Sequence, residues 1–274
     1  MHTHLRYREF IGDAHRLVVK IGSRVLVQST GRPHRRRMAA LVEQMAALQS
    51  GGREVVIITS GAVGTGMAGL GMKTKPTALA DLQMAAAVGQ ARLMTLYDTL
   101  FAKHGCRVGQ VLLTHDDFHN GIRQNNARRT MENMLAHGVI PIVNENDVVA
   151  VEELQSDLKK LGDNDLLAGM VTKMLHADLL ILLTTADGVR EFLPEGKSRR
   201  IPLIEAITPR IFKHVAPKAG GISTGGMGSK LRAAKGVAEA GISVVIADGR
   251  RPADLARIMA GRDVGTFILP SVAR

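Results

Sequence analysis

Continuous apolar runs alternate with stretches of helical hydrophobic spacing along the whole chain. The apolar runs are rich in valine, isoleucine and leucine and are short, which is typical of buried strands. We predict strands at residues 16–22, 54–61, 107–114, 138–145, 178–184, 242–247 and 265–269. Between these runs, apolar residues recur every three or four positions, as helices with one buried face require. We predict helices at residues 38–48, 78–104, 127–137, 165–175, 228–240 and 255–259.

This order of elements predicts an α/β fold with a mainly parallel central sheet, because buried parallel strands need helical connections that cover both faces. Ligands of such sheets bind beyond the carboxyl ends of the strands. No stretch resembles a linker between independent domains, so we expect a single domain over residues 1–274. Residues 193–202 are polar and contain two prolines, which indicates an exposed excursion in the second half.

Composition narrows the class of protein. Hydrophobic residues make up 45% of the chain and aromatic residues only 3%, so the core must consist mainly of aliphatic side chains. The single cysteine, Cys106, excludes an intramolecular disulfide, and its position at the entry to a predicted strand favours packing over catalysis. No apolar run approaches the ~20 residues of a membrane span, and no signal-peptide core is found. We therefore expect a cytoplasmic protein without a membrane partner.

The chain is strongly basic, with a formal net charge of +11. Nucleic acid is one class of partner for such a charge, and anionic small substrates are another. The arginines are scattered except at residues 32–37, and few aromatic residues are present to stack on bases. These features disfavour specific nucleic-acid binding.

Two clusters of acidic and amide side chains follow hydrophobic elements. Residues 144–147 read Asn-Glu-Asn-Asp directly after a predicted strand, and residues 163–165 read Asp-Asn-Asp before a predicted helix. Such side chains lose hydration when they are buried and need partners. The clusters therefore indicate a pocket that binds a small zwitterion and orients cationic side chains.

Lysine and glycine mark two further positions where an anion could bind. Lys20 ends the first predicted strand and is followed by Gly22, where the backbone can approach a phosphate. Residues 222–230 form a glycine-rich turn that ends in Lys230 and opens a helix, and helix N-termini favour phosphate. Together with the acidic clusters, these positions predict phosphoryl transfer from a nucleotide to a small amino acid.

Residues 59–71 form a second glycine-rich segment, which we interpret as a turn whose backbone N–H groups can hold an anion. Gly64, Gly66 and Gly69 fit the dinucleotide fingerprint G-x-G-x-x-G. We reject a dehydrogenase because the triplet is displaced from the strand and no acidic residue ends a strand about 20 residues later.

The segment "HDDFH" places His115 and His119 at i and i+4 with acidic residues between them. This spacing can bind a metal, but no third ligand is evident in the sequence. We therefore interpret the segment as a polar loop that enters a helix and predict no metal site formed by the protein alone.

The motifs occur in the order that the glutamate 5-kinases show, and the chain resembles this branch of the amino-acid kinase superfamily. The resemblance covers roughly residues 16–269 and includes "VVKIGS", "TSGAVGTG", "AAVGQARLM", "PIVNENDVVA", "GDNDLLA" and "STGGMGSKLRAA". It implies a three-layer α/β/α sandwich, with the amino acid bound by the N-terminal part and the nucleotide by the part from about residue 176. It also implies that ATP and L-glutamate give glutamyl 5-phosphate and ADP, the first step of proline biosynthesis.

The resemblance also implies site residues, carried over by motif. The positions that resemble the glutamate site are Ser60, Gly61, Asp147 and Asn164. The positions that resemble the ATP site are Lys20, Thr184, Thr185, Thr224, Gly225, Gly226, Met227, Gly228, Ser229 and Lys230. Homo-oligomers, dimers or tetramers, are implied as well.

The sequence departs from the family pattern in three places. Thr184 is followed by Thr185, where these kinases usually have Asp. Residues 151–160 lengthen the link between the two acidic clusters. Many members carry a C-terminal module of the type found in RNA-modifying enzymes, which we do not expect in this chain.

A carboxylate acceptor is already a nucleophile at neutral pH, so the predicted reaction needs no general base. The task is to stabilise charge and to position the reactants. We predict that Lys20 and Lys230 contact the transferring phosphoryl oxygens, and that Asp165 holds both lysines. Mg²⁺ would be held mainly by the ATP phosphates.

Three alternatives stay open at this point. The acceptor could be another carboxylate such as N-acetylglutamate or aspartate, although the acidic pocket favours a free amino group. The chain could be a nucleotide or amino-acid sensor without catalysis, or a basic nucleic-acid-binding protein.

Overall fold

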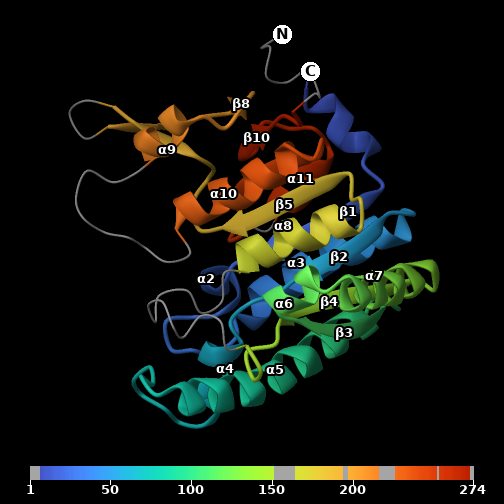
Figure 1. The fold of residues 1–274 in the computed structure, drawn as a ribbon, viewed down its shortest axis with the longest axis vertical. Helices are drawn as coiled ribbons and strands as arrows, with labels where there is room; N and C mark the ends of the chain where they lie inside the picture. The colour runs from blue at the N-terminus through green and yellow to red at the C-terminus, as the bar shows by residue number, and fades with distance from the viewer. Residues whose placement is uncertain (1–6, 151–163, 194–196, 216–225, 252, 272–274) are drawn as a thin grey trace.

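The computed structural model describes residues 7–150, 164–193, 197–215, 226–251 and 253–271 (Figure 1). Their strands form an eight-stranded sheet and a separate two-stranded sheet. The order in the large sheet is β3 (Arg107–Leu113), β4 (Val139–Glu145), β2 (Glu54–Ile58), β1 (Arg16–Ile21), β5 (Leu179–Thr184), β9 (Ser243–Asp248), β10 (Thr266–Ile268) and β8 (Leu203–Ile204).

The large sheet is parallel at every pairing except that of β9 with β10, where Phe267 lies opposite Val245 in an antiparallel register. The first strand, β1, lies in the middle of the sheet, with β2 on one side and β5 on the other. Strands from both halves of the chain therefore join one continuous sheet, as the alternation of runs and helices predicts.

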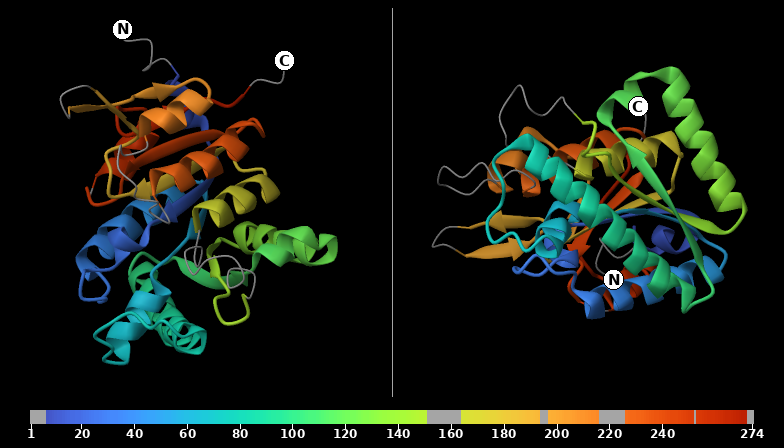
Figure 2. Two further views of the ribbon diagram at one scale, coloured as in Figure 1. Left: turned by 60° about the vertical axis from the view of Figure 1, so that its left-hand side comes forward. Right: turned by 90° about the horizontal axis from the view of Figure 1, so that it is seen from below.

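Helices cover both faces of the sheet, so the three-layer α/β/α sandwich is confirmed (Figure 2). One face packs against α3 (Arg35–Ser50), α5 (Leu79–Ala102) and α11 (Asp254–Met259). The other face packs against α7 (Gly121–Ala136), α8 (Asn164–Met174) and α10 (Met227–Ala238).

The sheet has one hydrophobic core on each face, because side chains alternate between the two faces along each strand. In β1, Leu17, Val19 and Ile21 belong to the core under α3 and α5, whereas Val18 belongs to the core under α8 and α10. The helical spacing of residues 38–48 is confirmed as well, because α3 buries Met38, Leu41, Val42, Met45 and Leu48.

The glycine-rich segment at residues 59–71 is mostly helix, so its interpretation as a turn was wrong. Ser60 and Gly61 connect β2 to α4, which extends over Ala62–Gly69, and a turn at Leu70 and Gly71 follows the helix. A Cβ on Gly66 would lie 1.7 Å from the Ala85 carbonyl oxygen, and one on Gly89 would lie 1.8 Å from that of Ala62. These two glycines therefore let α4 and α5 pack backbone against backbone.

Several short elements are not apparent from the hydrophobic pattern. These are η1 (Glu9–Asp13), α2 (Ser23–Leu26), α6 (His115–His119), β6 (Arg190–Phe192), β7 (Ser198–Arg200), β8 and α9 (Pro209–Val215). Strands β6 and β7 form an antiparallel hairpin, with Arg190 opposite Arg200, and this hairpin accounts for much of the predicted excursion at residues 193–202. Residues 194–196 lie outside the described part of the chain.

The segment "HDDFH" is itself a short helix, α6, so its interpretation as a loop was wrong. One of its acids caps the start of that helix. Asp117 Oδ2 accepts hydrogen bonds from the Thr114 backbone N–H at 2.7 Å and from the Thr114 hydroxyl at 3.0 Å. Thr114 and Asp117 thus form a capping box, which satisfies backbone donors that the first helical turn leaves open. The polar residues of this segment therefore have a structural role at a helix start.

Candidate active site

The middle of the sheet is also its topological switch point. From β1, the strand order continues through β2 on one side and through β5 on the other. Helices leave the sheet on both faces here, so a crevice opens beyond the carboxyl ends of these strands. Lys20 lies next to last in β1, in register with Ile58 and Leu182. The sheet therefore places Lys20 where ligands of such folds bind.

Lys20, Asp165 and Lys230 form a buried ionic cluster. Lys20 Nζ lies 2.7 Å from Asp165 Oδ1, and Lys230 Nζ lies 2.8 Å from Asp165 Oδ2. The exposed fractions of the three side chains are 8%, 1% and 7%. Burial alone would raise the pKa of Asp165, but the charges of the two lysines outweigh it and lower that pKa. Two ammonium groups and one carboxylate leave a net positive charge that suits an anion.

The secondary structure explains why these residues meet. Lys20 shares the sheet face of Val18, since side chains alternate along a strand, and this face is covered by α8 and α10. Asp165 is in the first turn of α8, and Lys230 is near the start of α10. Both helices direct their N-termini to the cluster, and their dipoles add positive partial charge there.

A chain of three buried amide side chains lies beside the cluster. Asn164 Nδ2 donates to Asn144 Oδ1 at 3.0 Å, and Asn144 Nδ2 donates to Gln90 Oε1 at 2.8 Å. Asn164 opens α8, Asn144 is in the last part of β4, and Gln90 comes from α5. These two hydrogen bonds therefore connect the start of α8 with α5 in the opposite helical layer.

Ser60 and Gly61 form the turn between β2 and α4. The Ser60 hydroxyl donates to the Ile21 carbonyl at 2.6 Å, which ties the turn to the end of β1. Gly61 has φ of 93°, and a Cβ there would lie 2.6 Å from Val27 Cγ2. Glycine is required on both counts. The first residues of α4, whose backbone N–H groups have no acceptor within the helix, line the cavity that opens here.

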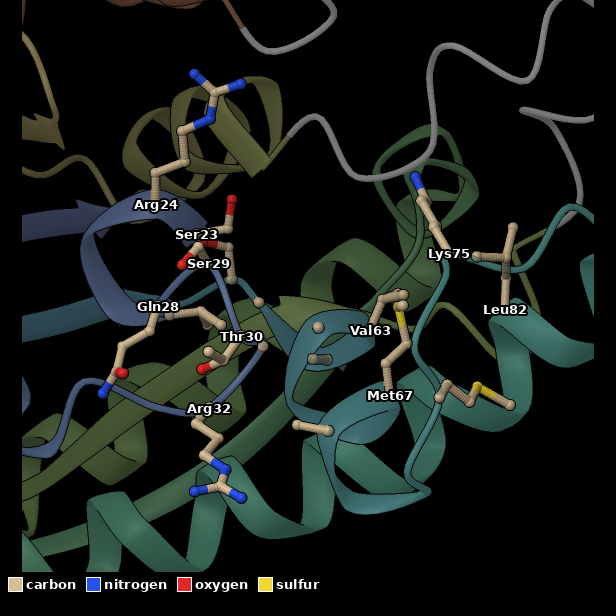
Figure 3. Close-up of a pocket in the computed structure, with 18 of the residues that line it drawn as sticks. Ser23, Arg24, Gln28, Ser29, Thr30, Arg32, Val63, Met67, Lys75 and Leu82 are labelled. Atoms are coloured by element: carbon tan, nitrogen blue, oxygen red, sulfur yellow. The ribbon is translucent and has the colours of Figure 1, made fainter.

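A cavity of about 970 Å³ opens beyond the ends of these strands, and its wall includes Ser60, Gly61, Asn144, Asp147 and Asn164. Figure 3 shows side chains of residues 23–32 on one side and side chains from α4 and the following loop on the other. The exposed cations in its lining are Arg24, Arg32, Lys73 and Lys75. The cavity therefore combines a wall of acidic and amide side chains with exposed cationic side chains at its rim.

Asp147 follows β4 and is half-buried in this wall. Burial raises the pKa of its carboxyl group to about 6. At neutral pH the carboxylate is ionised but poorly hydrated, which costs free energy. A cationic group of a ligand would offset this cost by pairing with the carboxylate.

The nucleotide-site residues predicted in the second half, as far as the structure describes them, follow strands on the other side of β1 or start α10. Thr184 ends β5 and is in register with Asp248 at the end of β9. The carbonyl of Thr185 accepts a hydrogen bond from Arg250 Nη2 at 2.7 Å, and Arg250 also pairs with Asp248 at 2.8 Å. Gly226 is the N-cap of α10, and Met227, Gly228, Ser229 and Lys230 form its start.

The structure thus brings Lys20, Asp165 and Lys230 together and places Ser60, Gly61, Asp147 and Asn164 around one cavity. Thr184 and Thr185 lie at the end of the neighbouring strand. The predicted positions Thr224 and Gly225, and the lengthened link at residues 151–160, lie outside the described residues.

Gln90 and Arg250 form hydrogen bonds at the site, but the sequence patterns did not single these residues out. Gln90 is polar but lies within the apolar stripe of α5, between Ala86 and Leu93, which are both buried. A polar residue within a buried stripe is a signal of an internal hydrogen bond. Its partner, 54 residues further along the chain, could not be found from the sequence.

Cys106 has no role at this site. It precedes β3, and burial raises the pKa of its thiol. A raised pKa reduces the thiolate fraction, so the residue is not an activated nucleophile.

Within the described part of the chain, no helix combines the length and the apolar character needed to cross a membrane.

The chain is similar to known proteins in both sequence and fold. The family model described as the amino acid kinase family matches residues 15–248. A glutamate 5-kinase of Thioalkalivibrio sulfidiphilus is 43% identical over 265 residues, which cover 96% of this chain and 69% of the relative. A glutamate 5-kinase of Moorella thermoacetica is 42% identical over 270 residues, which cover 98% of this chain and 70% of the relative.

Solved structures share the fold at low identity. The carbamate kinase from Giardia lamblia bound to AMP-PNP superimposes with a TM-score of 0.65 at 14% identity, covering 94% of this chain and 99% of that one. The isopentenyl phosphate kinase of T. acidophilum, in a product complex, gives a TM-score of 0.63 at 14% identity, covering 92% and 99%. These similarities support the sandwich fold alone.

Proposed function

The chain belongs to the amino acid kinase family and to its glutamate 5-kinases, and from this premise we propose how its residues perform the reaction. The enzyme phosphorylates the side-chain carboxylate of L-glutamate with ATP, giving glutamyl 5-phosphate and ADP, the first step of proline biosynthesis. The observation that carries the residue assignment is the buried Lys20–Asp165–Lys230 cluster beside a cavity with an acidic and amide wall.

Glutamate binds in the cavity with its α-ammonium group toward Asp147 and Asn164. Both present oxygen acceptors, and the half-buried carboxylate of Asp147 gains a counter-charge when the ammonium enters. Ser60 and Gly61 lie on the same wall, where the N–H groups at the start of α4 suit a carboxylate. The exposed arginines and lysines at the rim attract the anionic substrates.

The γ-carboxylate of glutamate attacks the terminal phosphorus of ATP, the bond to the bridging oxygen of ADP breaks, and no proton needs to be removed. Lys20 and Lys230 stabilise the charge on the transferring phosphoryl oxygens. Asp165 keeps both ammonium groups aimed while leaving the cluster a net positive charge. The rigid ends of β1, α8 and α10 therefore supply a preorganised electrostatic site.

ATP binds over the second half of the sheet, and the nucleotide-binding part begins at about residue 176. The residues assigned to it are Thr184, Thr185, Thr224, Gly225, Gly226, Met227, Gly228, Ser229, Lys230 and Lys20. The N-terminus of α10 favours phosphate through the positive end of its helix dipole. Arg250 donates a hydrogen bond to the backbone carbonyl of Thr185, the position where these kinases usually have Asp.

Mg²⁺ enters with ATP and is bound mainly by the phosphates. The described residues contain no group of three His, Cys, Asp or Glu side chains suited to a metal, and Asp165 is already engaged with two lysines. The ion would supply charge neutralisation on the phosphates. We further propose a cytoplasmic homo-oligomer, dimer or tetramer, with no role for nucleic acid.

The test measures ADP release from MgATP with L-glutamate, N-acetylglutamate, L-aspartate or no acceptor. Hydroxylamine is present to trap an acyl phosphate as its hydroxamate. We expect hydroxamate that depends on L-glutamate, with at most a few per cent of that rate from the other acceptors.

Turnover with N-acetylglutamate or aspartate instead would move the assignment to another acceptor within the family. ATP binding without turnover for any acceptor would support a sensor. Turnover with N-acetylglutamate would overturn the roles given to Asp147 and Asn164, because this acceptor has no free ammonium group. A sensor would overturn the roles given to Lys20 and Lys230.

A further inference from the structure

The chain of three amides has a direction. Gln90 offers its carbonyl oxygen to Asn144, so Asn144 uses its NH₂ group there and presents its own oxygen to Asn164. Asn164 then uses its NH₂ group on Asn144. Each amide carries one oxygen and one NH₂ group, so the orientation of the first determines that of the last.

The oxygen at the end of this series of amides, Asn164 Oδ1, is buried and has no hydrogen-bond partner among the described residues. Asn164 Oδ1 accepts no hydrogen bond there, although the side chain is only 6% exposed and Asn164 lines the cavity. A buried acceptor without a donor costs free energy, about 1–3 kcal/mol for a polar group. The site is therefore more favourable when a ligand brings a donor to this oxygen.

We propose that Gln90 is a positioning residue that makes the enzyme specific for an acceptor with a free α-ammonium group. By fixing Asn144, it orients Asn164 so that Nδ2 is used within the protein and Oδ1, in the wall of the cavity, is left to accept a hydrogen bond from a ligand. The ammonium group of glutamate donates to this oxygen. The inference deepens the proposed function and rests on it.

The chemistry predicts which ligands are rejected. Glutarate carries both carboxylates of glutamate but no amino group, so it would leave Asn164 Oδ1 without a donor. Sites built around a hydrogen bond reject analogues that lack the bonding group more strongly than apolar pockets reject a missing methylene. Glutarate should therefore bind far more weakly than glutamate in the native enzyme.

Two substitutions at Gln90 separate hydrogen bonding from packing. Gln90→Met keeps the length and volume of the side chain but removes the acceptor for Asn144. Gln90→Glu keeps an acceptor oxygen, and little is lost with the amide nitrogen, because Gln90 Nε2 is buried without a partner among the described residues. Glu can hold Asn144 in the native direction, whereas Met cannot.

The experiment measures kcat and KM for glutamate, KM for ATP, and Ki for glutarate as a competitor of glutamate. For Gln90→Met we expect KM for glutamate to rise about tenfold, the scale of one hydrogen bond. Ki for glutarate and KM for ATP should stay within about twofold, so the preference for glutamate over glutarate falls. Gln90→Glu should recover most of that preference.

A cycle with Asn164→Ala provides the second readout. If Gln90 acts through Asn164, then adding Gln90→Met to Asn164→Ala should change KM for glutamate by less than about twofold. Additive effects in the cycle, an equal loss of glutarate binding, or an unchanged KM in Gln90→Met would each overturn the proposal. Gln90→Ala carries the same expectations if the methionine variant does not fold.

The failure of the proposed function would be seen separately. A wild-type protein that shows no glutamate-dependent hydroxamate would refute the glutamate kinase assignment before any Gln90 variant is compared.

Discussion

Lys20 and Lys230 come from distant parts of the chain, and both lie within hydrogen-bonding distance of the Asp165 carboxylate. Because one acid serves two lysines, loss of either lysine leaves Asp165 paired. The folded state should therefore tolerate a lysine substitution here better than catalysis does.

For Lys230→Ala we expect kcat to fall by at least ~100-fold, the scale of removing one charge-stabilising group from a transition state. Thermal denaturation should show a native-like transition, because Lys20 still neutralises Asp165. Lys235→Ala on the exposed side of the same helix is the matched control and should keep wild-type kcat. A loss of less than about threefold in Lys230→Ala would contradict the role of Lys230.

Asp147 gives the enzyme a predicted pH dependence. Its pKa is raised to about 6 by burial, so its carboxylate becomes protonated as the pH falls through that value. The ammonium group of glutamate then loses its counter-charge, and kcat/KM for glutamate should decline below about pH 6. In Asp147→Asn, kcat/KM should be low and flat between pH 5 and 8, with the loss in KM, as a steady-state pH profile would show.

The same pKa predicts the sign of a stability effect. A carboxyl group whose pKa is higher in the folded state holds its proton more tightly there, so its contribution to stability declines as pH rises from about 4 to about 6. Asp147→Asn should thus be at least as stable as wild type at pH 7. A large fall in its unfolding free energy would mean that Asp147 serves the fold rather than the substrate.

The cationic and acidic residues of the site could be predicted because each stands at an element boundary with a plain sequence signal. Lys20 stands at the end of an apolar run, and Asp165 and Lys230 stand at helix starts. Gln90 stands inside a helix, and its polarity within a buried stripe indicates a hydrogen bond but not the partner. That partner, Asn144, lies in a different layer. Pairing across layers is a tertiary property and has no local pattern.

At the scale of elements, the contact between α4 and α5 depends on Gly66 and Gly89. Both meet a carbonyl oxygen of the facing helix, and a backbone atom cannot move aside as a side chain can. The turn at Gly61 leads directly into α4, so the position of this helix also fixes one wall of the cavity.

Gly66→Ala should lower the unfolding free energy by at least about 2 kcal/mol and raise KM for glutamate, because overpacking forces the two helices apart. Gly236→Ala is the matched control, since no atom lies within 4 Å of the added Cβ in α10. That change should stabilise the protein by about 0.5–1 kcal/mol. Urea denaturation of both variants decides the issue: equal stabilities would refute the close contact.

Elements with long apolar runs were predictable, whereas short ones were not. The parallel strands and α3, α5, α8 and α10 follow from periodicity, because their burial imposes it. The helix α4 was missed because its glycines are also typical of loops. The strands β6, β7 and β8 have three residues or fewer, too few to show a period, and the antiparallel direction of β10 is decided by its neighbours.

At the scale of the whole molecule, Arg8 joins the two ends of the described chain. Its guanidinium group is fully buried and donates to the carbonyls of Val264 at 2.7 Å, Pro202 at 2.9 Å and Gly265 at 3.0 Å. It also lies 6.0 Å from the centre of the Phe267 ring. Figure 1 shows η1 beside β10 at the end opposite α4 and α5.

Arg8→Met should lower the unfolding free energy by about 2–4 kcal/mol, because several carbonyls lose their donor at once. The cluster of Lys20, Asp165 and Lys230 lies elsewhere, so kcat at a permissive temperature should stay within about twofold. Arg36→Met on the exposed side of α3 is the control and should change stability by less than about 0.5 kcal/mol. Denaturation curves that coincide for the two variants would contradict a structural role for Arg8.

The central position of β1 has a consequence for biosynthesis. β2 follows β1 closely in the chain, but β5, its other neighbour, is completed only at Thr184. At the usual rate of translation, β1 therefore remains an open apolar edge for on the order of ten seconds. Such an edge can recruit strands from other nascent chains. Protection of the nascent first half by chaperones, rather than the stability of the finished enzyme, should then limit its yield in a cell.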